Sequence, residues 1–79
     1  MEYEVLKQAV KKALQVYDAE IQPESVFETE LGADSIDMAQ IFRLVEEQLN
    51  ISIPKERISD VRTVRDAYEL IRRVVAGHE

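Results

Sequence analysis

Apolar residues recur every three or four positions in three stretches of the chain, which is the spacing of one face of an α-helix. The first stretch covers residues 3–17, with lysines between its apolar positions, the second covers residues 34–49, and the third covers residues 64–77. The pattern predicts three main amphipathic helices. Three tyrosines fit the apolar stripes, and we expect them in the core or at its boundary: Tyr3, Tyr17 and Tyr68.

Residues that favour helix ends stand at the edges of these stretches. Asp34 suits the N-cap of the second helix, and Asp37 three residues later is typical of the acidic partner in a capping box. Thr63 and Asp66 have the same spacing at the start of the third main helix. Asn50 suits the C-terminal end of the second helix. These signals agree with the limits that the apolar pattern predicts.

The residues between the main helices predict one long loop and one short helix. Residues 18–34 lose the helical period and contain Pro23 and Gly32, which are typical of a loop. A loop of this length is unusual in a compact domain and is often functional. Residues 51–53 are too few to indicate a strand, and residues 56–61 predict one or two helical turns. We therefore predict an all-α four-helix bundle with a short third helix and a long loop between helices 1 and 2.

Length and composition exclude several classes of protein. The 79 residues suffice for one domain, 1–79, which we expect to be free-standing. Cysteine is absent, so disulfides, thiolate metal sites and a cysteine nucleophile are excluded. The one histidine, His78, is the penultimate residue, which argues against histidine-based acid–base catalysis. No apolar run could span a bilayer and the first residues are acidic, so we expect a cytoplasmic protein with no membrane insertion.

Acidic residues are concentrated in the first two thirds of the chain. The net charge is −6, and residues 1–54 hold four basic and eleven acidic residues, against six and five in residues 55–79. Between Asp18 and Asp37 there are seven acidic residues and no basic one. Phosphate backbones would repel such a segment, so we expect no nucleic-acid partner. A basic surface on a partner protein is the natural complement, although a merely solvated acidic face has the same composition.

One segment carries candidate chemistry, the run Leu31-Gly32-Ala33-Asp34-Ser35-Ile36-Asp37. Gly32 allows a tight turn before the helix, and Ser35 falls in the first helical turn. Its hydroxyl can face solvent there, and the unpaired N–H groups and the helix dipole favour an attached phosphate. The segment has no histidine or lysine to activate a nucleophile, so Ser35 suits modification better than attack. By itself, an Asp-Ser pair is also a common way to start a helix.

The chain resembles the acyl carrier protein family, the phosphopantetheine-bearing carriers of fatty-acid and polyketide synthesis. The resemblance covers nearly the whole chain, and the length and acidity agree with it. The residues that carry it are Phe27, the run 31–37, Glu46 and Glu47, the run 51–54, Thr63 and Val64, and Tyr68, Leu70 and Ile71. The first helix resembles the family in being a helix, more than in its individual residues.

The resemblance implies a carrier and not a catalyst. Ser35 would be the residue to which a phosphopantetheinyl transferase attaches the 4′-phosphopantetheine of coenzyme A. The flanking motif residues are Gly32, Asp34, Ile36 and Asp37. The thiol at the end of the arm would carry acyl groups as thioesters between enzymes of fatty-acid, polyketide or related lipid synthesis. We expect such a carrier to be monomeric.

The resemblance also implies a docking face on the second helix for acyl-processing synthase enzymes with basic surfaces. We expect this face to comprise Asp34, Ile36, Asp37, Ala39, Gln40, Arg43, Glu46 and Glu47. Gln40 stands where the family usually has an acid, and Arg43 where it usually has an apolar residue. Both changes make the face less acidic, and Arg43 would repel the arginines of a generic fatty-acid enzyme. One hypothesis is a specialised carrier with dedicated partners, and the other is neutral drift at the surface.

Family members that shelter the acyl chain do so between the second, third and fourth helices. The matching candidates here are Phe27, Met38, Phe42, Val45, Ile58, Val61, Ala67 and Tyr68. Phe42, Ile58 and Tyr68 are bulky, so we expect little expandable space and poor shelter for a long chain. Met38 is flexible, which would make some room.

Two alternatives stay open at the level of the sequence. A peptidyl or aminoacyl carrier has the same attachment chemistry, although the Ala-Asp-Ser run at 33–35 and the acidity favour the acyl type. A small helical interaction module without a prosthetic group has the same amphipathic helices, but it gives no reason for the run 31–37. An enzyme has no support, because no paired nucleophile or phosphate-binding glycine loop is present. The acidic loop lacks the spacing of an EF-hand, so we expect no metal site.

Overall fold

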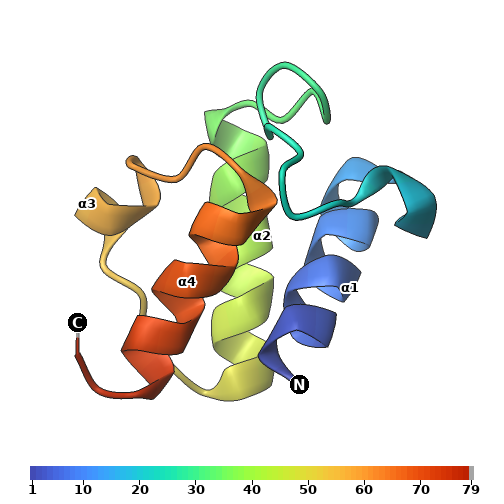
Figure 1. The fold of residues 1–79 in the computed structure, drawn as a ribbon. Helices are drawn as coiled ribbons and strands as arrows, with labels where there is room; N and C mark the ends of the chain where they lie inside the picture. The colour runs from blue at the N-terminus through green and yellow to red at the C-terminus, as the bar shows by residue number, and fades with distance from the viewer. Residues whose placement is uncertain (79) are drawn as a thin grey trace.

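The computed structural model describes residues 1–78, and Figure 1 shows how their helices are arranged. The elements are α1 (Glu2–Leu14), the 3₁₀ turn η1 (Asp18–Glu20), α2 (Ser35–Leu49), α3 (Lys55–Ile58) and α4 (Val64–Val75). Helices α1, α2 and α4 run side by side, and the short α3 lies on the outer side of the bundle (Figure 1). The predicted all-α four-helix bundle, with its short third helix and long loop, is confirmed. Within residues 1–78, no helix is long and apolar enough to cross a membrane.

The core lies where the apolar stripes of α1, α2 and α4 meet. Its largest fully buried side chains are Leu6, Val10, Ile41, Phe42, Val45, Val64, Leu70 and Ile71. Ile21, Phe27 and Ile53 add apolar side chains from the connecting segments. Each long helix thus buries one stripe and exposes the opposite side, as its helical period predicts.

Capping boxes start α2 and α4 where the sequence predicts them. Asp34 Oδ1 accepts a hydrogen bond from the Asp37 N–H (2.9 Å), and Asp37 Oδ2 accepts one from the Asp34 N–H (3.1 Å). Thr63 and Asp66 form the same reciprocal pair at the start of α4, with both donor–acceptor distances 3.1 Å. Asn50 ends α2 in the left-handed conformation, with a φ of 55°. Side chains therefore accept hydrogen bonds from otherwise unpaired N–H groups at the starts of α2 and α4, the helix ends that position the site.

The end of α1 differs from the prediction. The helix stops at Leu14, because Gln15 adopts the left-handed conformation, with a φ of 56°. The chain then turns away from the bundle, so Tyr17 is 81% exposed and the prediction that it lies in the core or at its boundary is wrong. Tyr3 and Tyr68 are partly buried against the core, as predicted.

The turn η1 is an element that the sequence does not predict. Lys7 Nζ donates a hydrogen bond to Asp18 Oδ2 (3.0 Å), and Lys11 Nζ lies 3.7 Å from Asp18 Oδ1. The hydrogen bond raises the pKa of Lys7 and lowers the pKa of Asp18 from their ordinary values. These contacts tie η1 to the side of α1.

Helix α3 also differs in its limits, since it starts one residue before the predicted range 56–61 and ends at Ile58.

The long loop is pinned to the connection between α3 and α4. Phe27 is buried, and its N–H donates a hydrogen bond to the Arg62 carbonyl (2.9 Å). An antiparallel bridge joins Val26 to Thr63 beside it. The loop, the start of α2 and the α3–α4 connection consequently lie at the same end of the bundle (Figure 1).

Candidate functional site

Ser35 is presented at the tip of α2. Gly32 turns the chain with a positive φ of 69°, and no atom crowds the place of a Cβ there, so glycine is needed for its conformation. Ala33 is buried, and its N–H donates to the Phe27 carbonyl (2.9 Å). Asp34 then caps the helix. Ser35 is therefore the first helical residue, and it is exposed to solvent.

The surroundings of Ser35 suit a modified hydroxyl better than a nucleophile. A helix N-terminus offers N–H groups and the positive end of the dipole, and both favour a phosphate. The nearest ionisable residues in the chain are Asp34 and Asp37, whose carboxylates already accept backbone hydrogen bonds. Within residues 1–78, no group of three His, Cys, Asp or Glu side chains could hold a metal ion. The exposed hydroxyl therefore fits a phosphate-linked group, and the segment around it has no histidine or lysine to act as a base.

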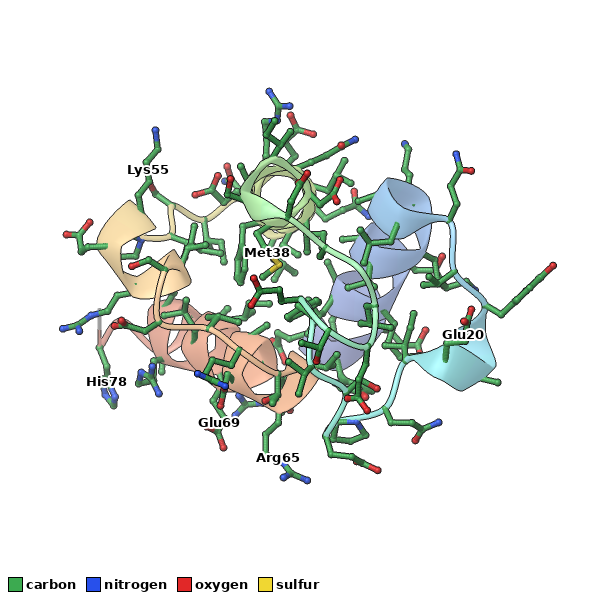
Figure 2. The ribbon with its side chains drawn as sticks, turned by 90° about the horizontal axis from the view of Figure 1, so that it is seen from above. Glu20, Met38, Lys55, Arg65, Glu69 and His78 are labelled. Carbon is green, nitrogen blue, oxygen red and sulfur yellow. The ribbon has the colours of Figure 1, made fainter. Side chains whose placement is uncertain are left out.

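A groove of about 1190 Å³ opens beside Ser35. Helix α2 lines one side, and α3, the segments on either side of α3 and the loop before α2 supply the rest. The apolar lining residues include Phe27, Met38, Phe42, Ile53, Ile58 and Val61. Figure 2, which looks down on this end of the bundle, shows Met38 pointing from α2 towards the middle of the molecule. An apolar group carried on Ser35 thus has a sheltered surface within reach.

The acyl-pocket candidates divide into two groups. Five of them line the groove, namely Phe27, Met38, Phe42, Ile58 and Val61. The other three, Val45, Ala67 and Tyr68, lie outside its lining. Tyr68 packs edge-on against the Tyr3 ring of α1, with ring centroids 5.4 Å apart and planes at 90°. Its bulk therefore does not fill the groove, whereas the other two bulky candidates, Phe42 and Ile58, do line it.

The docking-face candidates lie along α2. Ile36 is 75% exposed, and the exposed residues that follow it at helical spacing are Ala39, Gln40, Arg43 and Glu47. Glu46 is only partly exposed, because its Oε2 accepts a hydrogen bond from the Ile53 N–H (2.7 Å). Glu46 therefore supports the segment after α2 as well as carrying charge.

Sequence reasoning missed several residues of the groove. Ile53, Lys55, Ser59 and Arg62 also line it. They come from the irregular segments and the short helix between residues 50 and 63, where no period relates a residue to a face. Only the folding of the chain brings these four residues opposite α2.

The fold and the serine define a class of protein, the helical carriers that bear a phosphopantetheine arm. A family model described as a phosphopantetheine attachment site matches residues 4–71. The acyl carrier protein of Treponema pallidum (strain Nichols) is 40% identical over 70 residues, which cover 89% of this chain and 90% of that protein. The acyl carrier protein of Clostridium perfringens (strain SM101 / Type A) is 38% identical over 69 residues, covering 87% and 91%. That of Treponema denticola is 34% identical over 70 residues, covering 89% and 90%.

The chain belongs to the acyl carrier protein family. It is a non-catalytic carrier that bears acyl groups on a covalently attached 4′-phosphopantetheine. The predicted family, the cofactor and the carrier function are confirmed.

Proposed function

We propose that Ser35 is the serine that a phosphopantetheinyl transferase modifies. The observation that carries this proposal is the exposed hydroxyl at the first residue of α2, beside an apolar groove and held there by the turn at Gly32 and the cap at Asp34. In the attachment step the Ser35 oxygen bonds to the phosphorus next to pantetheine, and the bond from that phosphorus to the nucleotide half of coenzyme A breaks. The transferase accepts the hydroxyl proton, because no histidine or lysine adjoins Ser35 and the carboxylates of Asp34 and Asp37 are engaged in the helix cap.

Apart from the Ser35 oxygen, which forms the bond to phosphorus in the attachment step, the residues of this chain position the arm and take no part in bond making. The arm supplies a terminal thiol on which an acyl group is held as a thioester. Because Ser35 stands at the exposed tip of α2, an arm attached to it can reach away from the carrier into an enzyme. Met38 and Ile58 offer the acyl group a surface out of water between enzymes.

Intact mass after incubation with coenzyme A and a promiscuous transferase tests the attachment residue. We expect a single phosphopantetheine adduct on the parent protein and none on Ser35→Ala. Ser59→Ala is the matched control, because Ser59 is also exposed and lines the same groove. An adduct on Ser35→Ala, or its loss from Ser59→Ala alone, would contradict the assignment.

We further propose that synthase enzymes dock on α2 around Ser35 with basic residues opposite Asp37 and Glu47. The acidic stretch that leads into α2 supports this, since opposite charges speed encounter and fix orientation. Binding of a ketoacyl synthase should weaken when salt is raised, and unchanged binding between low and high salt would count against docking by charge.

We infer a cytoplasmic monomer. The large apolar residues that are exposed, Met1, Tyr17, Ile36 and Val75, come from separate segments of the chain, which supports a monomer. Sedimentation equilibrium across concentration tests the monomer, and a mass that rises with concentration would contradict it.

A further inference from the structure

Three basic residues surround the groove beside Ser35. Arg43 projects from α2, Lys55 is the first residue of α3, and Arg62 lies between α3 and α4. All three are exposed and line the groove, and together we call them the cationic rim. Within residues 1–78, Arg43 and Lys55 have no side-chain hydrogen bond or ion pair, while the charge of Arg62 also acts on Asp66. At least two of these cations are therefore available to a ligand.

Two of the carboxylates that line the same groove, unlike the side chains of Arg43 and Lys55, are already engaged in hydrogen bonds. Asp34 accepts the Asp37 N–H in the cap of α2, and Glu46 accepts the Ile53 N–H. A third, Glu28, belongs to the loop before α2. The acids nearest Ser35 in the chain thus gather at the start of α2, whereas Arg43 follows eight residues later, roughly 12 Å along the helix axis. The surface around the groove thus carries carboxylates at the start of α2 and three cations on its rim. Glu46, three residues after Arg43, lines the same groove, but it is only partly exposed and its carboxylate accepts the Ile53 N–H.

A surface divided in this way selects against a uniformly basic partner. Positive residues that face the acidic start of α2 would be attracted, while positive residues that face the cationic rim would be repelled. Because the rim residues are exposed and long, they suit charge pairing at the edge of a protein interface better than enclosure of a small ligand.

We propose that the cognate partner protein carries carboxylates opposite Arg43, Lys55 and Arg62, next to basic residues opposite the acidic start of α2. This inference rests on the proposed function, since it takes docking to occur on the face that presents Ser35. It assigns Arg43 a role in partner choice, in place of neutral drift.

Two double variants with the same change in net charge test the proposal. Arg43→Glu/Lys55→Glu reverses two rim charges, and Lys12→Glu/Arg65→Glu reverses two exposed charges that lie outside the groove. Figure 2 shows Lys55 and Arg65 pointing to opposite sides of the molecule. The probes are a ketoacyl synthase with a uniformly basic docking surface and a form of it in which those basic residues are replaced by glutamate.

At low ionic strength we expect Arg43→Glu/Lys55→Glu to bind the basic synthase about tenfold more tightly than the parent does. Towards the glutamate-substituted synthase the same variant should bind more weakly than the parent. The control variant should change either affinity by less than about threefold, and high salt should shrink all the differences.

Equal changes in the two double variants, or no change in Arg43→Glu/Lys55→Glu, would overturn the proposal, because the rim would then lie outside the docking surface. Intact mass of each form after treatment with transferase and coenzyme A separates this outcome from failure of the proposed function. An adduct on every form with no rim effect overturns the charge-divided surface alone. Lack of an adduct on every form, under conditions that modify a control carrier, overturns the proposed function and this inference with it.

Discussion

Asp66 holds the first turn of α4 with its carboxylate. Asp66 Oδ2 accepts hydrogen bonds from the N–H groups of Thr63 (3.1 Å) and Arg62 (3.2 Å). Burial alone would raise the pKa of this carboxyl, but the hydrogen bonds outweigh burial and hold its pKa below the ordinary value of 3.8. Because the pKa is lower in the folded chain than in the unfolded chain, the ionised group stabilises the fold above about pH 4. That stability is lost as the pH falls through the folded pKa.

Asp66→Asn should therefore lower the free energy of unfolding at neutral pH by about 0.5–1 kcal/mol, the typical strength of a carboxylate at a helix N-terminus. The difference from the parent should shrink as the pH falls below about 4, where the parent carboxylate also becomes protonated. Urea unfolding monitored by circular dichroism across this pH range measures both effects. Glu69→Gln, an exposed neutralisation on the same helix, is the control and should show neither. A difference that stays constant into acid would contradict this account of Asp66.

At the scale of the helix, the end of α1 stores a small backbone strain. Gln15 has a φ of 56°, a conformation that costs a residue with a Cβ about 1 kcal/mol and costs glycine little. Gln15→Gly should therefore raise the free energy of unfolding by about 0.5–1 kcal/mol. Gln8→Gly, in the exposed middle of the same helix, should lower it by about 1 kcal/mol. Chemical unfolding of the two variants measures the sign of each change in the free energy of unfolding. If both substitutions destabilise the protein, Gln15 is not strained.

The helices differ in how far the sequence predicts their limits. The starts of α2 and α4 follow from Asp34 and Thr63, because a capping box is made by residues three positions apart. The end of α1 does not follow from the sequence, because the apolar spacing continues to Tyr17 and a glutamine gives no sign that it will adopt a left-handed conformation. A cap made by residues three positions apart is readable in the sequence, whereas a left-handed helix end at a residue other than glycine or asparagine is not.

At the scale of the whole molecule, the site depends on contacts between distant segments. Ser35 and its motif are readable in the sequence, because they occupy one loop and one helix start. The groove is only partly readable: the family resemblance supplies five of its lining residues, but Ile53, Ser59 and Arg62 line it only because the chain after α2 folds back opposite that helix. Tyr68 shows the same dependence, since its contact with Tyr3 turns it towards α1 and leaves the groove open. Helical period predicts which residues are buried, but not what they are buried against.

This arrangement predicts where an acyl chain lies when the carrier is loaded. The groove is lined by Met38 and Ile58 and is open to solvent along α2, whereas Val45 and Ala67 are fully buried and lie outside its lining. A medium-length acyl chain on the Ser35 arm should therefore contact the groove without entering the close-packed core, because opening that core would disrupt packing among several helices.

Methyl chemical shifts of the carrier, compared between the unloaded arm and an octanoyl-loaded arm, measure this placement. We expect the Met38 and Ile58 methyl signals to move and those of Val45 and Ala67 to stay. Ile58→Ala should reduce the shift at Met38, since it removes one wall of the groove, while Val75→Ala, an exposed apolar position at the end of α4, should leave it unchanged. Large shifts at Val45 and Ala67 would instead show that the chain enters the bundle interior, and shifts at none of these four residues would show that it stays in solvent.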